Sequence, residues 1–268
     1  MNKTVLITGA TDGIGKQTAN EMANSGYQLI LHGRNDDTVK RTVNEISQQS
    51  GNKHIAGLEA DLASLDEVKQ LAEQVRQQYD TLDILINNAG IYQDRREMTG
   101  DGFEKTFQVN YLSHFLLTNK LLKLLKKRDD SRIVNVASMV HSTAIDFDNL
   151  QGEQRFDGSE AYGLSKLCNV LFTYKLARIL DDTSVTVNCL HPGVIDTKLL
   201  RKNWPGIGGP VKEGAENILF VATHPSLEEV SGKYFVNKMP QSSATASYEH
   251  DKQDRLWKIS HEMVKNQL

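Results

Sequence analysis

Short apolar segments alternate with amphipathic, helix-like segments along the whole chain, and this alternation most constrains the fold. The apolar segments, each expected to be a strand, are residues 3–8, 27–32, 54–60, 82–87, 132–138, 185–190 and 233–236. Helices are expected at about 16–26, 36–50, 64–79, 104–127, 159–181 and 211–223. Strands that alternate with helices pair in parallel through right-handed crossovers, so helices cover both faces of the sheet. The sequence therefore predicts an α/β fold with one doubly wound parallel sheet, forming a single domain over residues 1–268.

The first apolar segment, residues 3–8, runs into a glycine-rich turn that is followed by a helix. Backbone N–H groups at such a turn, together with the helix N-terminus, form a binding site for phosphate groups. The spacing from Gly9 to Gly15 is G-x-x-x-G-x-G rather than G-x-G-x-x-G. A Walker P-loop would require Gly at position 10 and Ser or Thr at position 17, where this chain has Ala10 and Gln17. The turn therefore predicts a pyrophosphate site but excludes a P-loop.

Tyr162 and Lys166 are four residues apart in a predicted helix, and Ser138 ends the apolar run IVNVAS. Side chains four residues apart lie on one helix face, with Cβ atoms about 5–6 Å from each other. An ammonium group beside a phenol favours the phenolate, which lowers the phenol's pKa and improves proton transfer. The three residues therefore predict proton transfer to or from a substrate oxygen.

In their order and spacing, these motifs resemble the short-chain dehydrogenase/reductase family over nearly the whole chain. The matching segments are TGATDGIG at 8–15, NNAG at 87–90, the set Asn110, Ser138, Tyr162 and Lys166, and PGVIDT at 192–197. The resemblance implies a catalytic set of Asn110, Ser138, Tyr162 and Lys166. Asn110 lies within a predicted long helix, where Asn is a weak helix former. We expect it to organise water in a proton relay linked to Lys166.

The resemblance also implies the contacts of a nicotinamide dinucleotide. They are Gly9, Thr11, Asp12, Gly13, Ile14 and Gly15 in the turn, Arg34 after the second strand, Asp61 and Leu62 at the adenine, Asn88, Ala89 and Gly90, Tyr162 and Lys166, and Pro192, Gly193, Val194, Ile195 and Thr197 at the nicotinamide. An N-cap role of Asp61 for the helix that starts near Ser64 is an open alternative.

The end of the second strand predicts which nicotinamide cofactor is used. NAD-binding relatives place an acidic residue there for the ribose 2′-hydroxyl, but this chain has Gly33 followed by Arg34. A guanidinium forms charge-assisted hydrogen bonds with a 2′-phosphate, which favours NADP. Asp36 and Asp37 argue the other way, although the first turn of a helix also accounts for them. Lys16 is expected to point to solvent.

The predicted function is an NADP(H)-dependent oxidoreductase that interconverts an alcohol and a carbonyl, with reduction favoured. One alternative is an NADP(H)-binding redox sensor without turnover, although such proteins commonly lose the tyrosine or lysine. Isomerisation or dehydration of nucleotide sugars is a second alternative, but it is associated with G-x-x-G-x-x-G and a larger C-terminal domain. Reduction of a carbon–carbon double bond remains a third.

The segment between Ser138 and Tyr162 is longer than usual for the family, and its FDNL element resembles the retinol-dehydrogenase-like subgroup. That resemblance implies an apolar aldehyde or ketone as substrate. Met139, His141 and Phe147 are candidates for the cavity entrance, with no catalytic role for His141, which is expected to be solvated. Residues 199–211, with Trp204 and several Gly and Pro, predict an irregular substrate lid or a plain connecting loop.

Composition limits the partners and the location. A formal net charge of −3 at neutral pH gives no basic footprint for nucleic acid. Two cysteines, Cys168 and Cys189, indicate reduced buried thiols in a cytoplasmic protein, and no cluster of residues has metal-ligand spacing. No run is apolar enough for a membrane span, and a signal peptide is not expected because the first strand starts at about residue 3. A homodimer or homotetramer is expected from the resemblance.

Overall fold

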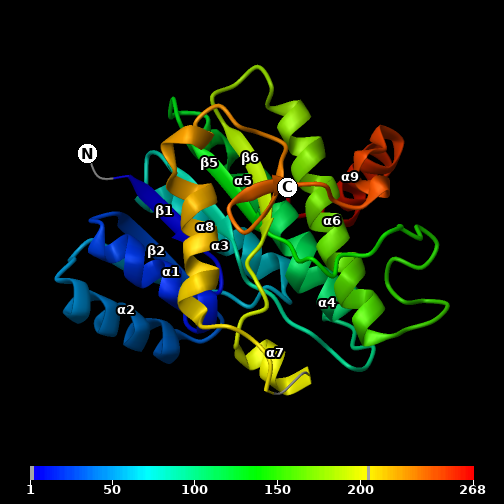
Figure 1. Cartoon of the computed structure of the whole chain (residues 1–268), viewed down its shortest axis with the longest axis horizontal. Helices are drawn as coiled ribbons and strands as arrows, with labels where there is room; N and C mark the ends of the chain where they lie inside the picture. The colour runs from blue at the N-terminus through cyan, green and yellow to red at the C-terminus, as the bar shows by residue number, and fades with distance from the viewer. Residues whose placement is uncertain (1–2, 204–205) are drawn as a thin grey trace.

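The computed structural model describes residues 3–203 and 206–268. One eight-stranded sheet has the order β3-β2-β1-β4-β5-β6-β7-β8, and every pairing is parallel except β7–β8 (Figure 1). The strands are β1 (Thr4–Ile7), β2 (Gln28–Gly33), β3 (Ile55–Glu59), β4 (Ile84–Asn87), β5 (Arg132–Val136), β6 (Thr186–His191), β7 (Tyr234–Val236) and β8 (Met239–Gln241). The predicted doubly wound α/β fold is confirmed.

Helices cover both faces of this sheet. They are α1 (Gly13–Asn24), α2 (Asp36–Ser50), α3 (Leu65–Gln78), α4 (Lys105–Phe107), α5 (Ser113–Leu125), α6 (Gly158–Ile179), α7 (Lys198–Asn203), α8 (Val211–Thr223) and α9 (His250–Met263). Helices α1, α2 and α8 lie together on one face, whereas α3 and α5 pack against each other on the other (Figure 1). Helix α9 packs against α6 and buries Leu256 in the core.

The central strand β1 shows how the sequence forms two cores. Successive side chains of a strand point to opposite faces of the sheet. Val5 and Ile7 therefore join the apolar cluster under α1 and α8, while Leu6 joins the cluster formed with α3, α5 and α6. All four residues of β1 are buried, which explains why the sequence shows a continuous apolar run rather than an alternating one.

Strand β8 was not predicted and forms an antiparallel hairpin with β7. Asn237 and Lys238 connect the two strands with positive φ angles of 49° and 64°. Positive φ at both central residues is the geometry of a type I′ turn, whose twist matches that of the flanking strands. The sequence gives a weak signal here because β8 has three exposed residues and lacks Gly in its turn.

The predicted helix over 104–127 is interrupted. Residues Gln108–Leu112 form a π-helical turn between α4 and α5. Such a turn inserts one residue into the helical repeat and is often found at functional sites. Asn110 lies at its centre and is fully buried.

Candidate active site

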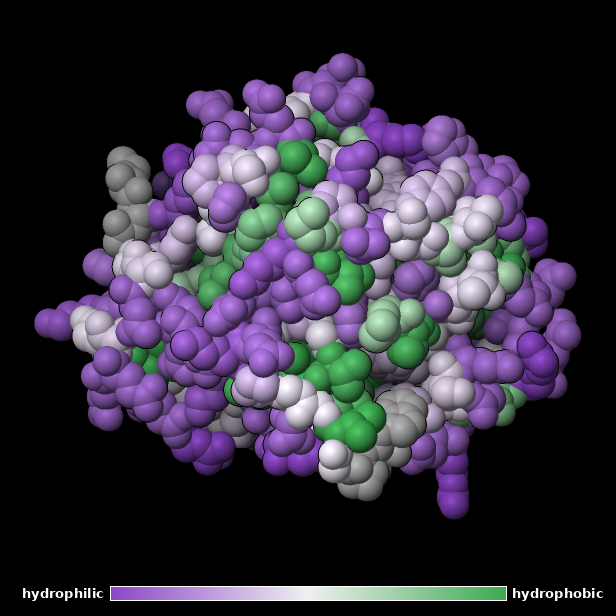
Figure 2. Space-filling view, viewed as in Figure 1, coloured by the Kyte–Doolittle hydropathy of each residue, from purple (hydrophilic) through white to green (hydrophobic). Residues whose placement is uncertain are grey.

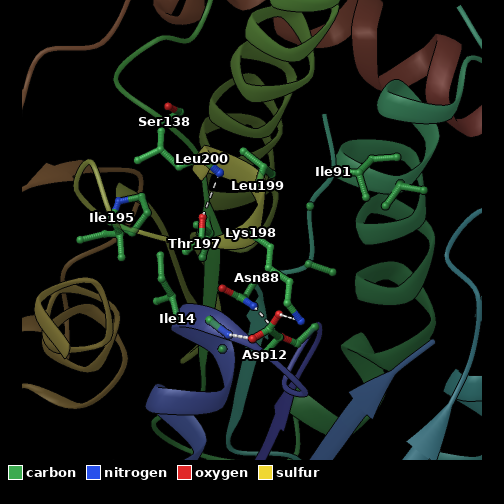
Figure 3. A pocket seen from close by; sticks show the side chains of 18 of the residues that line it. Asp12, Ile14, Asn88, Ile91, Ser138, Ile195, Thr197, Lys198, Leu199 and Leu200 are labelled. Atoms are coloured by element: carbon green, nitrogen blue, oxygen red, sulfur yellow. Dashed lines mark hydrogen bonds and ion pairs between the residues drawn. The ribbon is translucent and has the colours of Figure 1, made fainter. Parts of the chain in front are cut away.

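A cavity of about 760 Å³ opens where the carboxyl ends of β1, β4, β5 and β6 meet. The strand order reverses between β1 and β4, and in open α/β sheets ligands bind at such a reversal. Its volume falls in the range of cofactor and ligand sites, roughly 300–1,000 Å³. In Figure 3 the N-terminus of α1 carries Asp12 and Ile14 at one end of the cavity, while Ser138 lies at the other.

The glycine-rich turn lies along one wall of this cavity. Gly9 and Gly13 have positive φ angles of 65° and 53°, a region that glycine adopts more readily than any residue with a Cβ atom. A Cβ atom on Gly15 would lie 2.2 Å from the Gly9 carbonyl oxygen, so the helix meets the turn at backbone distance. No described residue accepts a hydrogen bond from the N–H of Ile14 or Gly15, both of which line the cavity. These free donors at a helix N-terminus suit the pyrophosphate of a dinucleotide.

Two buried side chains hold the turn in place. The Thr8 hydroxyl accepts hydrogen bonds from the N–H groups of Asn88 and Ala89 at 2.9 and 3.0 Å. His32 accepts a hydrogen bond at Nδ1 from the Gly9 N–H at 3.2 Å and donates from Nε2 to the Ala60 carbonyl at 2.9 Å. Because one nitrogen accepts and the other donates, this imidazole is neutral. Burial lowers the pKa of His32 to about 4, which keeps it so.

Ser138, Tyr162 and Lys166 line the opposite end of the cavity together. Ser138 follows β5, whereas Tyr162 and Lys166 lie one turn apart on α6, which begins at the N-cap Asp157. The Lys166 Nζ atom lies 5.5 Å from the centre of the Tyr162 ring and donates to the Val136 carbonyl at 2.9 Å. The expected shared helix face is thus present, and β5 anchors the lysine.

The pKa of Tyr162 differs from the expectation. Burial raises the pKa of the Tyr162 phenol to about 12, opposed by a hydrogen bond with Ser138. Burial also lowers the pKa of Lys166 to about 8. The pKa of Tyr162 therefore lies above its ordinary value, so the expected lowering of the phenol's pKa is not seen in this structure. Tyr162 is a protonated phenol at neutral pH, which is the form that donates a proton.

Asn110 lies behind the cavity wall rather than on it. Its side chain accepts from the Ile91 N–H at 2.8 Å and donates to the Ser165 hydroxyl and the Ile91 carbonyl, both at 3.0 Å. A Cβ atom on Gly90 would lie 3.5 Å from Lys166 Nζ and 3.6 Å from Asn110 Oδ1. Only a glycine-sized residue therefore separates the asparagine from the lysine.

Comparison with known proteins identifies the family. The model of the short chain dehydrogenase family matches residues 3–207. The chain belongs to the short-chain dehydrogenase/reductase family. Human retinol dehydrogenase 14 is 39% identical, with the match covering 98% of this chain and 86% of that protein. Human polyprenol dehydrogenase is 37% identical, covering 98% and 85%. The chain therefore lies among the retinol-dehydrogenase-like members, as predicted.

Comparison with solved structures supports the same fold and family. An uncharacterised protein from Mycobacterium paratuberculosis has a TM-score of 0.82 at 29% identity, with 98% of this chain and 93% of that chain covered. A short chain dehydrogenase from Escherichia coli, solved with NADPH, has a TM-score of 0.73 at 27% identity, with 89% and 98% covered. The oxidoreductase class and the dinucleotide-binding fold are thus established for this chain.

All the expected cofactor contacts of this dehydrogenase line the one cavity, although they come from distant parts of the sequence. They are Gly9, Thr11, Asp12, Gly13, Ile14, Gly15, Arg34, Asp61, Leu62, Asn88, Ala89, Gly90, Tyr162, Lys166, Pro192, Gly193, Val194, Ile195 and Thr197. Of the catalytic set, Ser138, Tyr162 and Lys166 line it as well, and Asn110 does not.

The end of the cavity where Asp61 lies answers one question that the sequence left open. The N-cap of α3 is Ser64, whose hydroxyl accepts from the Glu67 N–H, so the N-cap alternative for Asp61 is wrong. The Asp61 carboxylate accepts from the Ala63 N–H at 2.9 Å and lines the cavity. Lys16 was expected to point to solvent, but it forms an ion pair with Glu45 at 2.5 Å.

Arg34 lies exposed at the same end. Within the described part of the chain, no hydrogen bond or ion pair is made by its guanidinium. A Cβ atom on Gly33 would lie 2.4 Å from the Thr11 methyl and 2.8 Å from a Val39 methyl. An acidic residue at Gly33, as expected of NAD-binding relatives, does not fit without movement of the turn.

The predicted lid is partly helical. Residues Lys198–Asn203 form α7, so the prediction of an irregular segment from Leu199 onward is wrong over that stretch. Leu199, Leu200 and Ile207 line the cavity, whereas Trp204 lies outside the described residues. Lys198, which the sequence did not single out, reaches across to Asp12 in an ion pair of 2.7 Å (Figure 3).

The loop between Ser138 and Tyr162 meets only part of the expectation that Met139, His141 and Phe147 lie at the cavity entrance. Met139 lines the cavity, but His141 and Phe147 do not. Phe147 instead packs on the core beneath the Arg255 guanidinium, 4.3 Å from the centre of its ring. His141 is half-buried, and both of its ring nitrogens have hydrogen-bond partners within the protein.

In residues 3–203 and 206–268 no three His, Cys, Asp or Glu side chains form a group that would hold a metal ion. Over the same ranges, no helix has both the length and the apolar character that crossing a membrane requires.

Proposed function

We propose that this short-chain dehydrogenase/reductase uses NADP(H) to interconvert an alcohol and a carbonyl, chiefly by reducing an apolar aldehyde or ketone. The observation that carries the proposal is one cavity with two chemically distinct ends. At one end lie the free N–H donors of Ile14 and Gly15 and the guanidinium of Arg34. At the other lie Ser138 and Tyr162, whose hydroxyl groups are hydrogen-bonded to each other.

The cofactor preference rests on Arg34. A free guanidinium pairs with a phosphate through charge-assisted hydrogen bonds, which are about twice as strong as neutral ones. The short chain dehydrogenase from Escherichia coli that shares this fold was solved with NADPH, which supports the same preference. An acidic residue that would repel a 2′-phosphate is absent at Gly33, and the steric contacts there disfavour one.

The reaction follows from the protonation states of the site. When bound, the reduced nicotinamide supplies the hydride. The Tyr162 phenol, protonated at neutral pH, donates its proton to the carbonyl oxygen of the substrate. Ser138 donates a hydrogen bond to the same oxygen and stabilises the charge that develops on it. Lys166, held by Val136, supplies a positive charge behind the tyrosine.

The substrate class rests on the apolar rim of the cavity. Met139, Val140 and Ile207 line it and are 55%, 61% and 51% exposed. Figure 2 shows apolar residues gathered on this side of the molecule at the position that α7 occupies in Figure 1. Retinol and polyprenol, after which two relatives are named, are long apolar alcohols. An apolar substrate removes this rim from water, which stabilises the complex by about 25 cal/mol per Å² of apolar surface buried.

The test is the oxidation of NADPH and NADH, followed by absorbance, with a panel of apolar and polar aldehydes and ketones. We expect turnover with NADPH that falls at least about a thousandfold in Tyr162→Phe, because the proton donor is lost. Arg34→Ala should raise the KM for NADPH about tenfold to a hundredfold and leave that for NADH unchanged. Arg41→Ala, on the exposed side of α2, is the matched control.

Three outcomes would contradict parts of the proposal. Equal use of NADH and NADPH would refute the cofactor preference. Better activity on polar than on apolar carbonyls would refute the substrate class. Tight binding of NADPH without turnover on any substrate would favour the redox-sensor alternative.

The two cysteines are both buried and unpaired, and on that basis we also propose a cytoplasmic location.

A further inference from the structure

His141 is built into the loop that follows Ser138, and its ring connects two parts of the chain. Nδ1 lies 2.6 Å from the Ser138 carbonyl oxygen. Nε2 lies 3.0 Å from the Ala244 backbone nitrogen, in the segment after β8. Edge-to-face packing on Tyr234 of β7, with ring centres 5.2 Å apart, holds the imidazole between them.

The two hydrogen bonds require one tautomer. A carbonyl oxygen only accepts, so Nδ1 carries the proton that is donated to Ser138. A backbone N–H only donates, so Nε2 is the unprotonated nitrogen that accepts from Ala244. The neutral Nδ1–H form satisfies both partners, whereas an imidazolium would place a second donor against the Ala244 N–H.

The same loop is packed closely against the helix that carries Tyr162. Ser142 donates its N–H to the Gly163 carbonyl at 2.9 Å. A Cβ atom on Gly163 would lie 2.9 Å from both the Val140 carbonyl oxygen and the Ser142 hydroxyl. The loop therefore touches α6 directly beside Tyr162, and the ring of His141 holds its other side.

We propose that His141 is a positioning residue that sets the backbone of Ser138 relative to Tyr162 by linking the Ser138 carbonyl to the Ala244 N–H. The proposal rests on the proposed function, in which Ser138 and Tyr162 act on one substrate oxygen. His141 does not line the cavity, so it acts through Ser138 and not by touching the substrate. The C-terminal segment thereby contributes to the geometry of a site formed by the strand ends.

Three substitutions at His141 test its hydrogen bonds to Ser138 and from Ala244 separately. In His141→Asn the amide reaches the position of Nδ1 and donates to Ser138. In His141→Gln the amide oxygen reaches the position of Nε2 and accepts from Ala244. His141→Ala removes both bonds. His224→Ala is the matched control, because His224 accepts a hydrogen bond from the Ser226 N–H in a loop remote from the cavity.

Steady-state kinetics with NADPH and the best carbonyl of the panel give the first readout. We expect kcat to fall about tenfold in His141→Ala, as for loss of one hydrogen bond that acts in the transition state, with an unchanged KM for NADPH. His141→Asn and His141→Gln each keep only one half of the link, so each should recover kcat only in part, and His141→Asn more than His141→Gln because it keeps the bond to Ser138. His224→Ala should match the wild type in both parameters.

Hydrogen exchange of the Ala244 amide, followed by NMR, gives a second readout that does not depend on turnover. We expect protection in the wild type and in His141→Gln, and faster exchange in His141→Asn and His141→Ala. A kcat within twofold of wild type in His141→Ala, or an equal fall in all three variants, would overturn the proposal. Absence of turnover in the wild type would overturn the proposed function and this inference together, so the two failures are distinguishable.

Discussion

Buried His32 makes the stability of this fold depend on pH in a way that one substitution can isolate. Its ring accepts from Gly9 and donates to Ala60, so it is neutral in the folded chain, and burial lowers its pKa from 6.5 to about 4. The unfolded chain therefore binds the proton first as the pH falls. Stability is fully present above the ordinary pKa of 6.5 and is lost progressively as the pH falls toward about 4.

The linkage relation gives the size of this effect. Between about pH 7 and about pH 5, one histidine with these pKa values costs about 2 kcal/mol of unfolding free energy. Burial also lowers the pKa of His114 to about 3 and that of His191 to about 4. Both shifts have the same direction as that of His32, so these histidines also lower the unfolding free energy as the pH falls.

The experiment is urea unfolding at both pH values, with His32→Asn compared with wild type. Asn keeps an acceptor for the Gly9 N–H and does not titrate. We expect the variant to lose about 2 kcal/mol less than wild type between the two pH values, whatever its stability at neutral pH. His54→Gln, which removes an exposed imidazole, should keep the wild-type dependence. The same pH dependence in His32→Asn and wild type would refute the argument.

Three further predictions concern the cavity. Gly15→Ala should lower the unfolding free energy by about 1–3 kcal/mol or more and weaken NADPH binding in calorimetry, because its Cβ would lie 2.2 Å from the Gly9 carbonyl oxygen. The rate of carbonyl reduction should decline as the pH rises through about 8, where Lys166 loses its charge, as a pH–rate profile would record. Lys198→Ala should change the unfolding free energy by less than about 1 kcal/mol in urea titrations, because both partners of its ion pair with Asp12 are more than half exposed.

Each of these three predictions has an outcome that would contradict it. Gly100→Ala is the control for the glycine, since nothing lies within 4 Å of its Cβ position, and equal losses in both variants would contradict the steric argument. A pH–rate profile flat to well above pH 9 would contradict the role given to the Lys166 charge. A stability loss of several kcal/mol in Lys198→Ala would show that the pair is more than a surface contact.

Most of the fold was predictable because its signals are local. Strands such as β1 are continuous apolar runs, and the glycine-rich turn combines a strand, a conformational need for Gly and a helix start within a dozen residues. The candidate residues converge because parallel strands place their carboxyl ends at one edge of the sheet. The family resemblance supplied the expected role of each residue, which spacing alone does not supply.

The features that the sequence did not predict depend on contacts between distant segments. Asn110, at the centre of the π-helical turn, forms side-chain hydrogen bonds with Ile91 and Ser165, which no helical periodicity reports. From the sequence His141 is an ordinary loop residue, because its partner Ala244 lies about a hundred residues later in the chain. The pKa of Tyr162 depends on burial, which a helix-face argument does not include.

The hairpin of β7 and β8 closes one edge of the sheet, and this limits how the molecule can associate. An unpaired strand edge is a template for pairing with another chain and so for aggregation. Here the outermost strand has three residues, and one of them, Pro240, has no N–H to donate. A further strand would find few backbone hydrogen-bonding groups along β8. Copies of this chain that associate should therefore not do so by extending the sheet at β8.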